Sequence, residues 1–284
     1  MHSQIVFSQG GLGNQLFQYA FYLDIATRNG NCDFDISRIV YDNQHKGTNL
    51  GDLLGCDFYS FSHMGNKNLP FLIDDRISSK VIRWTLRLLN VRSCLDFFYD
   101  FDATTSYKSI DFNKNKYVGY FQFVDSAIKS KSIFEKMIEN KYRVEIENYR
   151  KSYGESKAIH IRRGDYFTSN SINHAVASEG EITSIVERYK DDKIVIFSDD
   201  IKWCTDKLSR FDNVDFHHGS SAIDDFLALS QCDSYVLLGS SFSWWAAFLF
   251  SDDSTELSFI SSTNIKYLSF EEMEKLDCKI VSIN

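Results

Sequence analysis

The sequence predicts an α/β fold built on parallel sheets, and two observations lead to this prediction. Near the start of the chain, an apolar run at 4–8, a glycine-rich turn at 10–14 and a helical pattern are followed by a second apolar run at 32–36. After residue 157, short apolar runs alternate with helical patterns as far as residue 250. Strands that alternate with helices in this way form βαβ units, and consecutive units build a doubly wound sheet.

In the first half of the chain, the turn leads into a helix that we expect from about Gln15 to Asn29. Gly30 suits the C-terminal end of this helix, because glycine readily adopts the left-handed conformation found there. Residues 37–75 have weak periodicity and are expected to be loops with short elements. A long, highly charged helix is expected at 126–151.

Residues 79–98 are expected to form an amphipathic helix. One face carries Trp84, Leu88, Val91 and Leu95, and the basic residues Lys80, Arg83, Arg87 and Arg92 lie elsewhere in the same stretch. Such a helix could attach to the inner face of a membrane that contains anionic lipids. The alternative is that its apolar face packs on the N-terminal domain, which is the usual arrangement in globular proteins and the one that we favour.

The second half is more regular. A domain boundary is expected near residue 155, where the regular alternation begins, which gives domains at 1–155 and 156–284. The expected strands are at 157–161, 193–198, 214–218 and 234–238, and the expected helices are at 181–190, 201–210, 222–233 and 244–250.

Composition excludes some classes of function. The 284 residues include 31 Lys and Arg against 39 Asp and Glu, a net charge of −8, which is a poor match to nucleic acid. The six cysteines are scattered without zinc-binding spacing, so isolated thiols in a reducing compartment are expected. Neither a signal peptide nor an apolar run of the ~20 residues needed to span a membrane is visible. We therefore expect a cytoplasmic protein, or one peripheral to the inner membrane.

Polar, specific sequences follow four of the expected strands. They are GGLGNQ at 10–15, RRGD at 162–165, SDD at 198–200 and GSSFS at 239–243. Ligands of open parallel sheets bind beyond the carboxyl ends of the strands. These four segments are therefore the candidate site.

The glycine turn matches neither common nucleotide-binding fingerprint. Gly11 and Gly13 are followed by Leu16 where the third glycine of G-x-G-x-x-G is required, and the Walker lysine is absent. A tight turn into a helix explains the glycines equally well. We expect Asn14 to be the N-cap of the helix, which would leave backbone N–H groups ready for an anion or a sugar hydroxyl.

The arginine pair is more informative. Alternation along the strand places His160 and Arg162 on one face. Arginine matches a phosphate with two parallel hydrogen bonds, so we expect Arg162 to face the ligand. A structural ion pair is the alternative, and Arg163 with Asp165 suits that description.

The serine-rich segment at 239–243 could cradle a phosphate through hydroxyl and backbone N–H groups, or simply cap the following helix. Asp225 could face solvent, or it could accept from the N1–H and 2-amino groups of guanine. Asp199 and Asp200 are adjacent and not in a D-x-D pattern. Together these features describe a nucleoside-diphosphate site without metal ligands, in which Arg162 and helix N-termini neutralise the leaving group.

The segments GGLGNQLFQYA, HIRRGDY, FSDD and GSSFSWWAAFL resemble the motifs of the bacterial and animal α-1,2-fucosyltransferases, glycosyltransferase family 11. More loosely, they are similar to motifs of α-1,6- and protein O-fucosyltransferases. The matches occur in the expected order over residues 8–250, although 37–125 carries none. Two departures are Ile161, where valine often follows the histidine, and Gly239, where asparagine is common.

The resemblance implies a GT-B fold, in which two Rossmann-like domains face each other across a cleft. The C-terminal domain would bind GDP-fucose and the N-terminal domain mainly the acceptor. It implies inverting transfer of L-fucose to the 2-hydroxyl of a galactoside, in glycan or O-antigen synthesis, with no metal or other cofactor. The acceptor would be a galactose-terminated oligosaccharide or a lipid-linked glycan.

Residue roles follow from the same resemblance. Arg162 would stabilise the departing GDP, and His160 and Asp225 would hold guanine. Asn14 would reach fucose and the β-phosphate, and Asp165 is a candidate general base. The remaining residues, expected around the donor nucleotide, are Gly11, Gly13, Arg163, Ser240, Ser241 and Phe242.

Two other functions stay open at this point. One is transfer of a different GDP-deoxyhexose or formation of another linkage. The other is a non-catalytic module that binds nucleotide sugars. The position of Arg162 argues against the second, because a binding protein gains nothing by stabilising a leaving oxygen.

Overall fold

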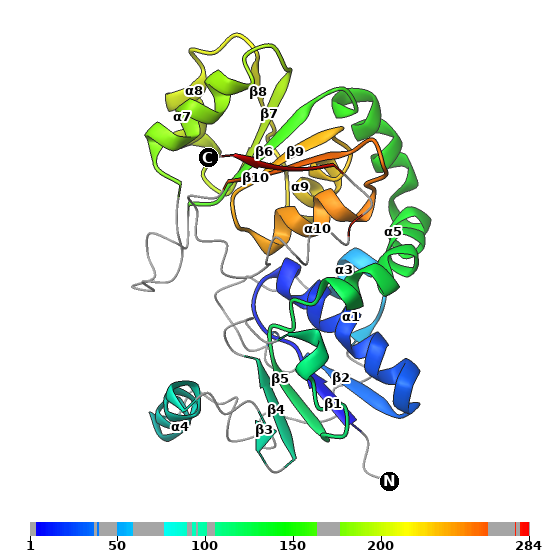
Figure 1. The fold of residues 1–284 in the computed structure, drawn as a ribbon. Coiled ribbons are helices and arrows are strands. Elements are labelled where there is room, and N and C mark those ends of the chain that lie inside the picture. Colours follow the sequence, from blue (N-terminus) through cyan, green and yellow to red (C-terminus); the bar gives the residue numbers. More distant parts are fainter. Residues whose placement is uncertain are drawn as a thin grey trace. The chain divides into compact units, whose positions relative to one another are not determined.

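The computed structural model describes residues 4–36, 39, 50–58, 77–89, 93–94, 96–100, 106–163, 177–260, 276 and 279–283. The chain divides into two compact units, Met1–Ile133 and Phe134–Asn284. Figure 1 shows the helices and strands of both.

The N-terminal unit is built on a five-stranded sheet in the order β2-β1-β5-β4-β3. Only the short pair β3–β4 is antiparallel. The strands are β1 (Gln4–Phe7), β2 (Cys32–Asp35), β3 (Ser93–Cys94), β4 (Phe97–Asp100) and β5 (Lys116–Gly119). Between β1 and β2 runs α1 (Leu12–Asn29), which ends at Gly30 with a φ of 79°, as expected for a left-handed cap.

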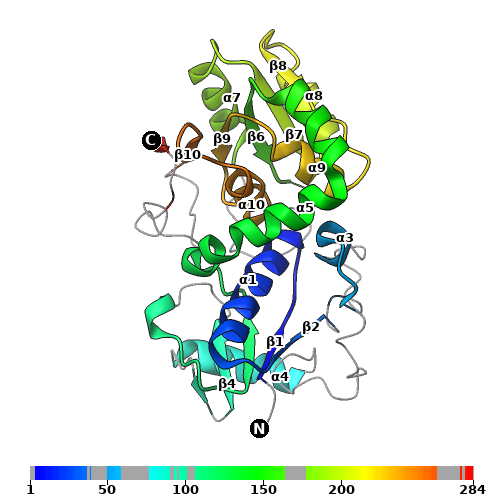
Figure 2. The same ribbon diagram turned by 90° about the vertical axis from the view of Figure 1, so that its right-hand side faces the viewer.

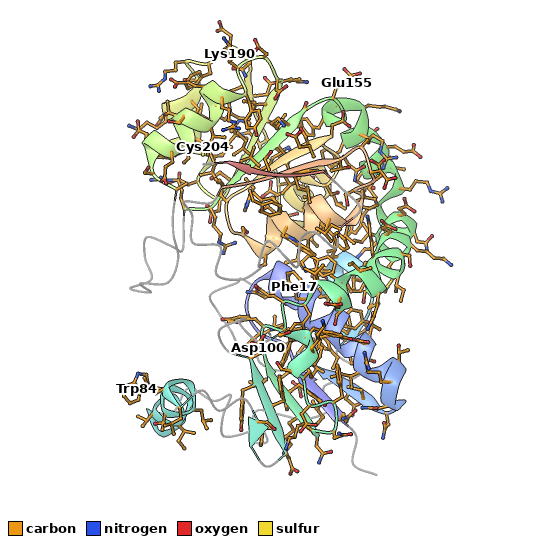
Figure 3. The ribbon with its side chains drawn as sticks, viewed as in Figure 1. Phe17, Trp84, Asp100, Glu155, Lys190 and Cys204 are labelled. Atoms are coloured by element: carbon orange, nitrogen blue, oxygen red, sulfur yellow. The ribbon has the colours of Figure 1, made fainter. Side chains whose placement is uncertain are left out.

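Aromatic side chains fill the core of this unit. From α1, the rings of Phe17 and Phe21 are fully buried, and Phe21 stacks on Phe121 at a centroid distance of 4.4 Å. Figure 3 shows Phe17 and Asp100, two of its buried residues. The high aromatic content is therefore used largely for packing.

The long charged helix expected at 126–151 is confirmed as α5 (Val124–Tyr153). The division between the two units falls within it, whereas the boundary predicted at 155 lies at its C-terminal end. Beyond Ile133 the helix packs on the C-terminal unit, where it runs beside α9 and α10 (Figure 2), and Phe134 lies 5.5 Å from the ring of Trp245.

The C-terminal unit has a six-stranded, fully parallel sheet in the order β11-β10-β9-β6-β7-β8. Its strands are β6 (Lys157–Ile161), β7 (Ile194–Ser198), β8 (Val214–Phe216), β9 (Ser234–Leu237), β10 (Glu256–Ile260) and β11 (Lys279–Ile283). Its helices after α5 are α7 (Glu179–Arg188), α8 (Ile201–Leu208), α9 (Ala222–Leu229) and α10 (Ser241–Leu249). Helices α7 and α8 lie on one side of the sheet and α9 and α10 on the other (Figure 1), which makes it doubly wound as predicted.

The helix predicted at 79–98 is wrong in its second half. Helix α4 spans Ile77–Leu88, and the chain then forms strands β3 and β4. Phe98 and Tyr99 are buried, and β4 pairs in parallel with β5 along its whole length. Local periodicity could not reveal this pairing, because β5 is distant in the sequence and lies in a stretch where no strand was expected.

The favoured packing of α4 on the N-terminal domain is also wrong for two of its apolar residues. Trp84 and Leu88 are 62% and 64% exposed, and Trp84 is the labelled side chain of α4 in Figure 3. Leu86, on another side of the helix, packs against Phe7 and Tyr99 of the sheet instead. Val91, Leu95 and Arg92 lie outside the described residues.

In the part of the chain that the structure describes, no helix combines the length and apolar character that crossing a membrane requires.

Candidate active site

The C-terminal sheet has its topological switch point between β6 and β9. The chain moves outward from β6 through β7 to β8, and then returns through α9 to β9 on the other side of β6. Ligands of doubly wound sheets bind in the crevice at this point. Arg162 follows β6 directly, and Gly239 and Ser240 follow β9, so two of the predicted segments meet there.

His160 is the last but one residue of β6. Its side chain is buried, and its Nδ1 has no hydrogen-bond partner among the described residues. Burial, with a further contribution from Arg162, lowers the pKa of His160 to about 3, so its imidazole is neutral at physiological pH. An unsatisfied nitrogen in the interior has a free-energy penalty that a bound ligand can relieve.

Phe242 brings α10 next to this histidine. Its ring lies 5.3 Å from that of His160 and 5.4 Å, edge to face, from Phe226 of α9. Helix α10 starts at Ser241, earlier than the predicted residue 244, because Gly239 turns the chain with a φ of 81°. Ser240 is the N-cap but makes no side-chain capping bond, so backbone N–H groups of the first turn are left for another acceptor.

Asp225 belongs to the first turn of α9 and lies beside His217. Its Oδ1 is 3.4 Å from His217 Nε2, and Tyr153 OH is 3.1 Å from His217 Nδ1. Burial, with Asp224 and Asp199 nearby, raises the pKa of Asp225 to about 6. The Asp225 side chain remains 34% exposed, so it is accessible to a ligand.

The hydrogen bond between Tyr153 and His217 bears on which nitrogen of His217 carries the proton near Asp225. Burial lowers the pKa of His217, and a neutral imidazole has one N–H. If Tyr153 donates to Nδ1, the Nε2–H points to the carboxylate; the other tautomer would turn a lone pair to it. His217 Nε2 faces Asp225 Oδ1 at 3.4 Å without the geometry of a hydrogen bond.

Gly219 leaves the space that this arrangement needs. A Cβ built there would lie 1.8 Å from Asp225 Oδ1 and 3.0 Å from His217 Nε2. Any side chain at 219 would displace the carboxylate.

Arg163 has structural contacts, and their partners were not predicted from the sequence. Its guanidinium stacks on Trp203 at 3.5 Å, its Nε lies 3.7 Å from Asp200 Oδ2, and its backbone N–H donates to Asp199 at 2.8 Å. Asp165, its predicted partner, lies outside the described residues. Arg162 is half-buried at the end of β6.

The same contacts account for the acidic pair after β7. Asp199 accepts from Arg163, and Asp200 caps α8 through a bond from the Trp203 backbone N–H. Within the described ranges, no group of three His, Cys, Asp or Glu side chains has the geometry of a metal site.

The glycine turn of the N-terminal unit differs from the prediction. Helix α1 begins at Leu12 with Gly11 as N-cap, so the expectation that Asn14 is the N-cap is wrong. The turn is made by Gly10, with a φ of 79°, and Gly13 is buried in the first turn of the helix. Asn14 accepts a 2.9 Å hydrogen bond from Gln122 Nε2 instead.

Two residues of interest were missed from the sequence, His217 and Gln122. His217 follows the short strand β8, where two adjacent histidines were read only as part of a strand. Gln122 follows β5, within the stretch that had no interpretable pattern. A polar residue within three positions of the end of a strand was the available signal in both cases.

Comparison with known proteins identifies the family of the chain. The family model for glycosyl transferase family 11 matches residues 4–278. An α-1,2-colitosyltransferase of Escherichia coli is 27% identical over 84% of this chain and 85% of its own length. The O-antigen biosynthesis glycosyltransferase WbnK of the same species is 26% identical over 84% and 88%. A mouse galactoside α-(1,2)-fucosyltransferase is 26% identical over 39% of this chain and 32% of its own length.

Solved structures agree on the fold. The fucosyltransferase NodZ from Bradyrhizobium superposes with a TM-score of 0.52 and 15% identity, covering 87% of this chain and 93% of that chain. This likeness and the two parallel α/β units confirm the predicted GT-B type of fold. With a family match over nearly the whole length, the chain belongs to glycosyl transferase family 11.

Proposed function

We propose that this enzyme transfers L-fucose from GDP-β-L-fucose to the 2-hydroxyl of a galactoside, with inversion to an α-linkage. The observation that carries the proposal is the group formed by His160 and Phe242, in contact at the switch point of the C-terminal sheet, with Asp225 of α9 next in sequence to Phe226, which also contacts Phe242. It offers an aromatic ring, a neutral imidazole and a carboxylate, a combination that suits guanine.

In the proposed reaction, the acceptor oxygen attacks the anomeric carbon while the bond from that carbon to the β-phosphate oxygen breaks. Negative charge then develops on the departing GDP. Arg162, at the end of β6, and the backbone N–H groups at the start of α10 would stabilise it without a metal. A base must also take the acceptor proton; Asp165 is our candidate from the sequence.

A related GDP-deoxyhexose is the second candidate donor. The Escherichia coli relative that is 27% identical is named a colitosyltransferase. The guanine-binding part of a site does not distinguish one transferred sugar from another. The linkage formed could also differ from α-1,2.

Purified enzyme with a panel of GDP-sugars and galactosides, followed by NMR of the product, tests both candidates. Release of GDP from GDP-fucose only when a galactoside is present, with a new α-1,2 linkage in the product, would support the proposal. Faster transfer of another GDP-deoxyhexose would favour the second candidate. Binding without turnover of any donor would indicate a non-catalytic module.

We further propose that the enzyme works in the cytoplasm, with α4 attached to the inner membrane face, where lipid-linked acceptors are located. Val81, Trp84 and Leu88 leave an apolar surface exposed. Helical spacing places positions 80, 83 and 87, all basic in the sequence, next to one another along the same helix. Anionic lipid is the partner that this combination fits.

Co-sedimentation with vesicles tests the attachment. Binding to vesicles rich in phosphatidylglycerol, lost when Lys80, Arg83 and Arg87 are changed to Glu, would support it. The same triple change at exposed lysines of α5 provides a control for net charge alone. Absence of binding by the unmodified protein at low salt would refute the attachment and leave the transfer reaction untouched.

A further inference from the structure

The N-terminal sheet has a switch point of its own, between β1 and β5. From β1 the chain passes through α1 to β2 on one side, while β5 pairs in parallel with β1 on the other. The loops that follow these two strands, Ser8–Gly11 and Tyr120–Phe123, therefore leave the same edge of the sheet side by side. This is the position at which open parallel sheets bind ligands.

Both loops are held in unusual backbone conformations. Gly10 has a φ of 79°, Gly119 a φ of 154°, and Phe121 a φ of 49°, which is uncommon for a residue with a side chain. A Cβ at Gly119 would lie 2.4 Å from the backbone oxygen of Asp100. Strain of this kind persists only where the surrounding structure enforces it.

Two fully buried polar side chains enforce it. Gln18 of α1 donates to Gly119 O at 2.8 Å and accepts from Ser8 Oγ and the Gln9 backbone N–H, which connects one loop to the other. Asp100 accepts from the Phe121 backbone N–H at 3.1 Å. The edge is thus a rigid, preorganised structure.

Gln122 and Asn14 lie at this edge. Gln122 is 7% exposed, and its Nε2 donates to Asn14 Oδ1 at 2.9 Å. Its Oε1 is buried and has no hydrogen-bond partner within the described part of the chain. A buried carbonyl oxygen without a partner is unfavourable by itself, and a ligand hydroxyl would satisfy it.

The pair offers one donor and one acceptor. Asn14 contributes its Nδ2 amino group and Gln122 its Oε1 oxygen. If both side-chain amides were flipped, the free donor would be Gln122 Nε2 and the free acceptor Asn14 Oδ1. The pair would still offer one donor and one acceptor, because each amide has an NH2 group and a carbonyl oxygen. A sugar hydroxyl both donates and accepts, so it matches such a pair. The half-buried ring of Tyr120 lies beside the Gly10 turn and adds an aromatic wall.

We propose that Gln122, held in place by Asn14, binds a pyranose hydroxyl through its Oε1 in the N-terminal unit and selects the substrate. For Asn14 itself, the family resemblance already implies a position near the transferred sugar. The sugar is either the acceptor or the transferred sugar of the donor. The proposal rests on the proposed function only in taking both substrates to be sugars.

Gln122→Met tests this site, because methionine keeps the size and loses both hydrogen-bonding groups. We expect the KM for one sugar substrate to rise about tenfold, the usual loss for one hydrogen bond to a buried group. A rise for the acceptor alone assigns the site to the acceptor, and a rise for the donor alone assigns it to the transferred sugar. Gln122→Glu, which keeps an acceptor oxygen, should recover part of the loss.

Gln15→Met is the matched control. Gln15 is equally buried nearby, but both ends of its amide are satisfied, by Gly10 O and by the Leu50 backbone N–H, each at 2.9 Å. We expect Gln15→Met to lower the melting temperature by several degrees. Gln122→Met should change the melting temperature much less.

Substrates that lack one ring hydroxyl at a time complete the test. The native enzyme should lose about tenfold in kcat/KM with one of them, and Gln122→Met should no longer distinguish that substrate from its parent. Unchanged KM values for both sugars, or a melting temperature as low as that of Gln15→Met, would overturn the proposal. A native enzyme that makes no α-1,2 product would refute the proposed function instead, and the Gln122 comparison would then use the active pair.

Discussion

Replacing Asp225 by Asn should stabilise the fold while it weakens recognition of the donor. Asp225 has a pKa of about 6, raised from the ordinary 3.8 chiefly by burial and then by Asp224 and Asp199. A raised carboxyl pKa means that the folded protein disfavours the ionised form. Stability from this group therefore falls as pH rises from 3.8 to about 6, and the full penalty is present above that.

The size of the penalty follows from this shift. Two pKa units at about 1.36 kcal/mol each give an upper limit of about 3 kcal/mol. Because a third of the side chain is exposed, solvent screening reduces this to about 1 kcal/mol. Loss of a negative charge from the first turn of α9 offsets about 0.5 kcal/mol of the gain. We expect a net gain of about 0.5 kcal/mol at pH 8, a rise of about 1–2 °C in melting temperature, and no gain at pH 4.

The effect on binding has the opposite sign. Asparagine offers an amide in place of the carboxylate, so hydrogen bonds from N1–H and the 2-amino group of guanine would be lost or weakened. We expect a loss of about 2–3 kcal/mol, or about 30- to 150-fold in Kd for GDP. The native protein should likewise lose GDP affinity as the pH falls below about 6. Calorimetric titration with GDP and with IDP, which lacks the 2-amino group, measures both effects. A variant that is less stable at pH 8, or that still prefers GDP over IDP, would refute the reasoning.

Three further predictions concern Arg162, the need for a metal and Gly219. Arg162→Ala should reduce kcat about 100-fold or more with a smaller change in GDP affinity, and Arg162→Lys should be similarly impaired in kcat. If Arg162→Ala kept more than about a tenth of the native kcat, a loss of only ~1.4 kcal/mol, the role of Arg162 would be contradicted. Activity should be complete in EDTA, and loss with rescue by Mn²⁺ would place the chemistry in a metal-dependent class. Gly219→Ala places a methyl group where Asp225 Oδ1 lies, so KM for GDP-fucose should rise about tenfold at similar kcat, and His218→Ala, a change at an exposed neighbour, provides the control.

Much of the candidate site was accessible from the sequence because parallel strands share a direction. Once β6 and β9 were recognised as strands separated by helices, the residues after them had to leave the same edge of the sheet. His160, Ser240 and Phe242 were therefore predictable as one group without knowledge of any contact. The glycine at 239 and the apolar run before it were enough to place the last two.

Local pattern was insufficient where an element depends on a distant partner. The predicted amphipathic helix ran as far as residue 98 and so into β4, which the pairing with β5 makes a strand. The exposure of Trp84 and Leu88 could not be predicted from local pattern either. Amphipathicity shows which residues share a face of a helix but not what covers that face.

The sequence by itself determined the α/β class, the alternation of strands and helices from β6 to α10 and the residues that follow those strands, because these depend on periodicity and chain direction. The tertiary structure alone decided the partners. Tyr153 reaches His217 across 64 positions, Gln122 reaches Asn14 across 108, and Arg163 contacts Asp199 and Trp203. Hydrogen bonds and ring contacts act over a few ångströms in space regardless of separation along the chain, and only the folded arrangement of strands brings those groups together.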